Sequence, residues 1–224
     1  MTKSSLSLAS SRTKRRKEAV REILLKRDIT GLVEYSLQDK NILRTLSTLL
    51  YDSDPLVVRR AIEGLGRVSK KMGEKGLEPV RRLIRQLLWS MNDESGSIGW
   101  YAPEAIGEIL YNSPTLQGEY LPILISNLET EPFGAGICRA MARISGRFPG
   151  AVKPFAGELR KSLEAADIKE SGWAAVAMMR AGLIIGWSDV PRNIREYEIE
   201  YYNFATGTIT RGTPVIISSA PDCS

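Results

Sequence analysis

The sequence predicts an all-α protein made of repeated helical pairs, followed by a small β-hairpin near the C-terminal end. Apolar residues recur at helical spacing over most of the chain, and a similar apolar motif returns roughly every 40 residues, which is the signature of a repeat array. A later stretch alternates Glu with Tyr and Ile, the two-residue period of a strand. With 43% apolar and 25% charged residues among 224, the composition is that of a globular protein.

The composition excludes several kinds of catalytic and metal site. The chain has no histidine and two cysteines, so it cannot form a Ser-His-Asp triad, a His-ligated metal site or a zinc-thiolate cluster. We therefore expect no metal and no cofactor. It has no apolar run near the ~18–20 residues of a membrane span. We expect no secretory leader and a cytoplasmic protein.

The positive charge is concentrated at the N-terminus. Residues 1–27 hold nine basic and two acidic side chains, whereas the rest of the chain is slightly acidic. We expect a flexible Ser-rich start over residues 1–11, then a helix from Arg12 to Arg27 that caps the array. Its apolar side carries Ala19, Val20, Ile23 and Leu24. As an alternative, this basic segment binds nucleic acid or acidic lipid. It is the one part of the chain whose charge suits either ligand.

The first helical pair begins after residue 39. Leu43, Leu46, Leu49 and Leu50 form the apolar stripe of its first helix. The turn Asp52-Ser53-Asp54-Pro55 places an Asp where it caps a helix and a Pro at the first helical position. In the second helix, Gly64 and Gly66 leave room for a neighbouring helix to approach closely.

This unit resembles a HEAT-like repeat through the stretch from Asp52 to Gly66. A second motif, E-S-G-x-I-G-W-x-A-P-E-x-I-G-E from Glu94 to Glu108, is similar to that of bacterial and archaeal HEAT-repeat proteins labelled phycobilisome-lyase (PBS lyase) HEAT-like. The resemblance implies an armadillo-type fold, a right-handed α-α superhelix of antiparallel helix pairs. It also implies, as one possibility, an activity toward a tetrapyrrole.

These patterns divide the chain into three predicted parts. We expect a basic N-terminal segment with its capping helix over 1–27, a HEAT-like repeat array over 28–190, and a C-terminal β-hairpin with a tail over 191–224. The hairpin turn is expected at Thr206-Gly207, and the residues after Ile217 are expected to be disordered. Because a two-stranded hairpin is marginal alone, it must dock on the last repeat or on a partner.

The candidate binding site lies in the second repeat, where a longer, glycine-bearing turn replaces the compact turn of the first. Its inward positions are aromatic and acidic, which suits a protein partner with a basic segment. The predicted partner-binding residues are Asp93, Glu94, Trp100, Tyr101, Glu104 and Glu108. No residue is predicted to be catalytic.

A structural interpretation competes with this site. Glu104 and Glu108 lie one helical turn apart, so both could pair with arginines of adjoining repeats. The candidate arginines are Arg139 and Arg143 on one side and Arg60 and Arg67 on the other. In the same way, Trp100 and Trp173 are expected to fill the space between repeats, and Cys138 is expected to be a buried apolar residue.

Three functions are open at this stage. The first is a non-catalytic scaffold that binds a protein through its concave face. The second is a bilin-lyase-like accessory factor that handles a tetrapyrrole, in which case the protein is a lyase. The third is a nucleic-acid-binding HEAT-like protein, which fits a net acidic body poorly.

Overall fold

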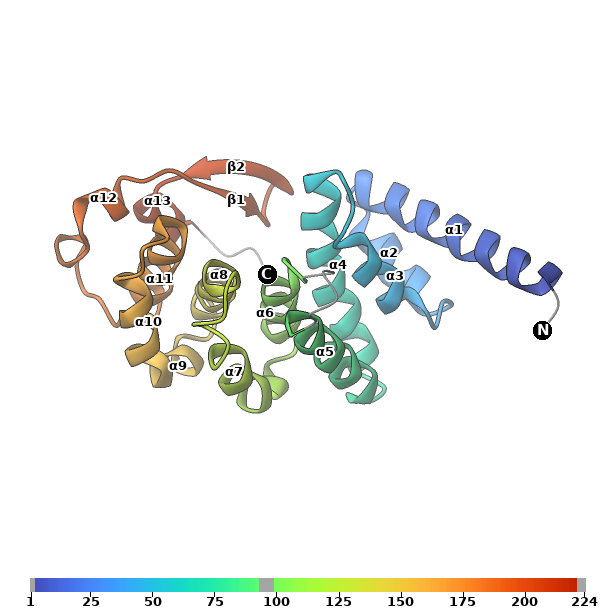
Figure 1. Ribbon diagram of the computed structural model, residues 1–224, viewed down its shortest axis with the longest axis horizontal. Coiled ribbons are helices and arrows are strands. Elements are labelled where there is room, and N and C mark those ends of the chain that lie inside the picture. Colours follow the sequence, from blue (N-terminus) through green and yellow to red (C-terminus); the bar gives the residue numbers. More distant parts are fainter. Residues whose placement is uncertain (1–2, 93–98, 221–224) are drawn as a thin grey trace.

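The computed structural model describes residues 3–92 and 99–220. The chain is mostly helical, with one two-stranded antiparallel sheet near the C-terminus, as the sequence predicts. Figure 1 shows the helices following one another from the N-terminal helix to the C-terminal end, with the strands laid along one side.

Helices succeed one another in pairs through the middle of the chain. After α1 (Lys3–Leu25) and α2 (Ile29–Ser36) come α3 (Ile42–Leu49) and α4 (Pro55–Gly73), α5 (Glu78–Met91) and α6 (Ala102–Asn112), α7 (Gln117–Ile125) and α8 (Gly134–Ser145), and α10 (Ala156–Leu163) and α11 (Ile168–Arg180). The shorter elements are α9 (Pro149–Val152), α12 (Arg192–Arg195), α13 (Pro214–Ser219) and 3-10 turns at Pro114–Leu116, Lys153–Phe155 and Trp187–Asp189. The second helices contact one another in sequence, α4 with α6, α6 with α8, and α8 with α11.

The predicted turn chemistry is present at the start of the second helices. The Asp54 carboxylate accepts a hydrogen bond from the Leu56 amide at 2.9 Å, and Pro55 opens α4. Pro103 falls in the first turn of α6, where a missing amide hydrogen costs little. These local signals therefore set both helix starts.

Small residues set the spacing of the second helices. A methyl group on Gly66 of α4 would lie 2.8 Å from the Glu108 carbonyl oxygen of α6. A methyl group on Gly107 would lie 2.4 Å from the Cβ of Ala140 on α8. Gly66 therefore packs closely against a neighbouring helix, as predicted, and the same device recurs at the next interface.

One continuous core runs through these helices. Leu46, Leu65, Ile106 and Met141 are fully buried members of it, and the helix pairs share it without a break. Cys138 is buried, and its thiol pKa rises to about 12 because burial disfavours the thiolate. The expectation of a buried apolar cysteine is confirmed.

The N-terminal segment differs from the expectation in two ways. Helix α1 begins at Lys3, so the Ser-rich start is helical rather than flexible; the described segment contains neither Gly nor Pro to stop the helix. Val20 and Leu24 are fully buried as predicted, but Ala19 is exposed. In Figure 1, the first half of α1 extends beyond the other helices.

The C-terminal hairpin is formed by β1 (Ile199–Asn203) and β2 (Thr208–Gly212), with Tyr201 opposite Thr210. Gly207 has φ +70°, a left-handed conformation that favours glycine, at the predicted turn. The expectation of disorder after Ile217 is wrong for the described part, because α13 continues to Ser219. The last four residues lie outside the described chain.

We predict that Gly107→Ala lowers the free energy of unfolding by about 1–3 kcal/mol, because the added methyl overpacks the contact with Ala140. Gly118 is the matched control, since a methyl there meets no atom within 4 Å. Gly118→Ala should be neutral or slightly stabilising. Denaturant unfolding of both variants checks the prediction, and equal midpoints would show that α6 and α8 are not closely packed.

Candidate functional site

The two carboxylates of α6 are engaged by arginines of the neighbouring helices. Glu108 has a side chain 2% exposed and accepts hydrogen bonds from the Nε of Arg143 at 2.7 Å and the Nδ2 of Asn112 at 2.8 Å. Burial raises the pKa of Glu108, while Arg143 and Asn112 act in the opposite direction. A carboxylate so enclosed is not open to a partner protein.

Glu104 joins three helices. Its Oε2 forms an ion pair with Arg59 of α4 and lies 3.3 Å from the Nη1 of Arg139 of α8. The same arginines stack on aromatic rings, Arg59 over Tyr101 at 5.0 Å and Arg139 over Trp173 at 4.9 Å. We call the surface of α4, α6, α8 and α11 that carries these pairs the inner face.

The structure thus separates the predicted binding residues. Glu104 and Glu108 pair with Arg139 and Arg143, the structural alternative weighed from the sequence. On the other side the partner is Arg59 rather than Arg60 or Arg67, since the helical phase of α4 turns Arg59 toward Glu104. Asp93 and Glu94 lie outside the described residues.

The hairpin covers the inner face, a contact that the sequence did not reveal. Tyr202 donates a hydrogen bond to Glu63 of α4, and Arg143 lies 3.9 Å from the Phe204 ring centroid. Figure 1 shows β1 and β2 stretching from the α12–α13 end of the molecule toward α4. The hairpin therefore docks across several helices rather than on the last repeat alone.

The tip of the hairpin is also tied to the N-terminal part of the chain. Arg27 donates to the Ala205 carbonyl at 3.1 Å and also contacts Glu63 at 3.2 Å. Arg60 donates to the Gly207 carbonyl at 3.1 Å and to the Leu25 carbonyl at 2.7 Å. Arg27 and Arg60 therefore bind the protein's own chain.

A separate surface remains accessible, which we call the aromatic groove. It is lined chiefly by Leu50, Tyr51, Leu87, Trp100 and Tyr101 and encloses about 290 Å³. The end of α3, the turn before α4, helix α5 and the segment before α6 contribute its walls. Tyr51 is 56% exposed and Trp100 is 59% exposed, so two large rings meet solvent at this groove.

The position of Trp100 differs from the one expected from the sequence. It does not fill the space between repeats, because α6 begins at Ala102 and Trp100 lies before the helix. Gly99 holds this segment against α5: its amide donates to the Ser90 carbonyl at 3.2 Å, and a methyl on it would lie 2.4 Å from the Ser90 Oγ. Trp173, the other tryptophan of the prediction, is 7% exposed and does lie in the core.

No protein-family model and no curated protein matches the chain. The HEAT-like and PBS-lyase-like resemblance therefore remains a prediction from the sequence motifs. Among the helices that the structure describes, none combines the length and hydropathy needed to cross a membrane.

We predict that Glu108→Gln destabilises the fold by about 3–5 kcal/mol, because it leaves the Arg143 guanidinium in a buried site without its counter-charge. Glu119 offers a matched control, since its pair with Arg81 is exposed at the surface. Glu119→Gln should cost about 0–1 kcal/mol. Urea unfolding measures both, and a tolerated Glu108→Gln would indicate that the inner face is hydrated.

We predict that Tyr202→Phe loosens the hairpin, because it leaves a buried oxygen of Glu63 without the phenol donor. The expected loss is about 1–3 kcal/mol, with faster amide hydrogen exchange over residues 199–212. Tyr201→Phe on the same strand is the control. Unchanged exchange in Tyr202→Phe would mean that other contacts hold the hairpin.

Proposed function

We propose that the protein is a non-catalytic helical-repeat scaffold that binds a protein partner through the aromatic groove. The helix pairs, with their recurring small residues at the contacts between second helices, support a HEAT-like superhelix as the framework. The proposal moves the binding surface from the concave face to the groove, because the hairpin and the Glu–Arg pairs already fill the inner face.

The observation that carries the proposal is the pair of exposed rings beside an apolar cavity. Tyrosine and tryptophan are enriched among the residues that dominate binding energy at protein interfaces, especially where an anchor side chain fills a pocket. The groove offers such a pocket, and its apolar lining includes Leu50, Leu87 and the rings of Tyr51 and Trp100. A partner segment with one large apolar anchor side chain fits this chemistry.

The charged residues near the groove affect which residues can lie beside the anchor residue in the partner segment. Asp52, which lines the groove, is paired with Arg21 at 3.1 Å and is therefore neutralised by the protein itself. Asp93 and Glu94 lie outside the described residues. The preference for a basic partner segment, which rests on their charge in the sequence, stays part of the proposal.

The two alternative functions gain less support from the described residues. A cavity of 290 Å³ is at or below the ~300–1,000 Å³ of ordinary small-ligand pockets, and a tetrapyrrole is a large ligand. The nucleic-acid alternative relies on the basic N-terminal segment, where Arg16, Arg21 and Arg27 already pair with carboxylates. The scaffold is therefore the function that we propose.

We predict that peptides selected from a random phage-displayed library on the wild-type protein share an apolar anchor residue and bind at the groove. Trp100→Ala should weaken their binding at least about tenfold, since it removes one wall of the pocket. The melting temperature should stay near that of wild type, because Trp100 is outside the core.

Trp89→Ala is the matched control, an equally large exposed tryptophan on α5 that does not line the groove. Isothermal titration of the selected peptides with the three proteins gives the comparison. Equal affinity for wild type and Trp100→Ala, or equal losses in both variants, would rule out the groove as the binding surface.

A further inference from the structure

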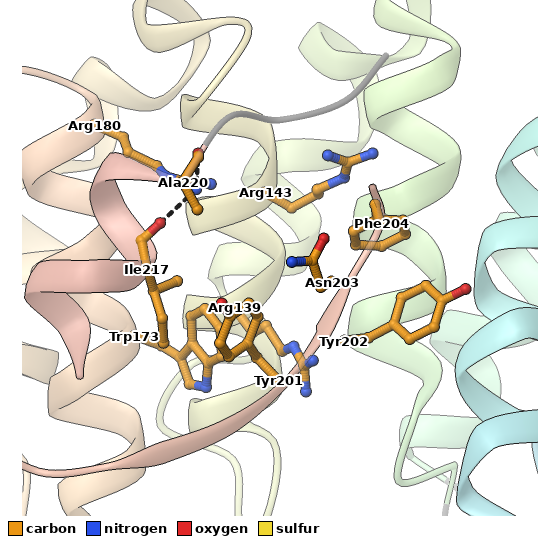
Figure 2. Close-up of a pocket in the computed structure, with 10 residues that line it drawn as sticks. All are labelled: Arg139, Arg143, Trp173, Arg180, Tyr201, Tyr202, Asn203, Phe204, Ile217 and Ala220. Carbon is orange, nitrogen blue, oxygen red and sulfur yellow. Dashed lines mark hydrogen bonds between the residues drawn. The ribbon is translucent and has the colours of Figure 1, made fainter. Parts of the chain in front are cut away.

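A small cavity lies under the hairpin, between α8, α11 and β1, apart from the aromatic groove. Figure 2 shows three arginines around it, Arg139 and Arg143 from α8 and Arg180 from α11. The cavity encloses about 60 Å³. Because a bound water needs about 10–15 Å³ by the same measure, there is room for a group of roughly four to six heavy atoms.

The arginine from α11 is held in a fixed orientation. Arg180 donates to the carbonyl oxygens of Ala142 at 3.0 Å, Ile217 at 2.8 Å and Ala220 at 3.2 Å. Its Nε also donates to the Ser218 carbonyl at 3.4 Å, so backbone oxygens of α8 and α13 fix the guanidinium. Figure 2 shows Arg180 beside Ile217 and Ala220. Arg180 therefore contributes a fixed positive charge to the cavity rather than N–H donors for a ligand.

The two arginines of α8 are held by rings and carboxylates. Arg139 stacks on Trp173, and Arg143 stacks on the Phe204 ring at 3.9 Å. The rings of Trp173 and Phe204 also line the cavity, so its surroundings combine cationic and apolar groups. Electrostatic attraction is stronger in such partly desolvated surroundings than in water.

Among the described residues, Arg139 has only a shared carboxylate as its direct ion-pair partner. It shares Glu104 with Arg59, whereas Glu108 is engaged by Arg143. Glu200 also attracts the Arg139 charge, but from beyond ion-pair distance. Burial lowers the pKa of Arg139 to about 10, which is the direction expected for a cation short of water. A further negative group beside Arg139 would offset the free-energy cost of burying its positive charge.

We propose that this cavity is an oxyanion site that takes a carboxylate or a phosphate group. The planar guanidinium of Arg139 can donate paired hydrogen bonds to either group, and the cavity has their size. The site is distinct from the aromatic groove and does not depend on the scaffold function.

Two sources can supply this chemistry. One is a free small anion in solution. The other is the chain itself, since Ala220 lines the cavity and Asp222 follows two residues later in the sequence, within about 7 Å of chain. Asp222 lies outside the described residues, so an experiment has to separate the sources.

The test uses the full chain and inorganic phosphate at constant ionic strength, with potassium chloride as the balancing salt. Tryptophan emission is the readout, because Trp173 stacks on Arg139 and should respond when an anion draws the guanidinium. We expect a saturable change in emission that Trp173→Phe abolishes. Arg139→Gln should weaken the apparent affinity at least about tenfold, since it removes a charged fork.

The controls distinguish the site from general salt effects and from misfolding. Arg82→Gln removes an exposed arginine from α5 and should respond like wild type. If circular dichroism shows that Arg139→Gln does not fold, Arg139→Lys replaces it, and its binding should be weaker because lysine lacks the fork. A phosphate response in the folded Arg139 variant equal to that of wild type overturns the proposal.

Asp222→Asn separates the two sources. A response in the wild-type chain identifies a site open to free anions. A response that appears only in Asp222→Asn identifies the chain's own carboxylate as the usual occupant. Both outcomes support an oxyanion site, whereas no response in either protein overturns it.

Discussion

The close approach of α4, α6 and α8 is the constraint on which the other features of this protein depend. Gly66 and Gly107 remove the side chains that would keep these helices apart. At this spacing, Glu104 reaches arginines on both sides and Glu108 reaches Arg143. A bulkier residue at either glycine would lengthen these ion pairs as well as disturb the packing. The apolar core and the buried charges therefore share a single geometric requirement.

The hairpin makes contacts that the buried charged side chains of the helices need. Buried ion pairs are favourable only when the remaining donors and acceptors are satisfied and the geometry is good. Tyr202 donates a hydrogen bond to Glu63, and Phe204 covers Arg143, so the hairpin supplies both a hydrogen-bond donor and an apolar cover. The appendage that looks separate in the sequence is thus part of the interior, and the accessible aromatic surface lies elsewhere.

Local features of the fold could be predicted from the sequence because they depend on neighbouring residues. The start of α4 with its cap at Asp54, the turn at Gly207 and the two strands all follow from short-range rules. The start of α1 could not be placed, since a Ser-rich stretch has neither a strong helical pattern nor a residue that breaks a helix. Burial of Ala19 was mistaken because a small shift in helical phase moves a residue between the inside and the outside.

The site was harder to predict, because it depends on which segments meet. The sequence correctly offered Arg139 and Arg143 as partners for Glu104 and Glu108, since their repeat positions correspond. It could not show that the hairpin covers these residues, because Tyr202 lies far along the chain from Glu63 and no local pattern links them. The outward position of Trp100 could not be predicted either, because Trp100 lies before α6, where helical phase gives no guidance.

The contact of Arg27 with the Ala205 carbonyl closes the chain on itself. In an open array each repeat touches only its neighbours, so the ends can fray while the middle stays folded. Here the hairpin is bound to Arg27, which follows α1, so segments far apart in the sequence are held together across the intervening helices. Opening of either segment must then break contacts of the other. We expect such a chain to unfold in a single cooperative transition.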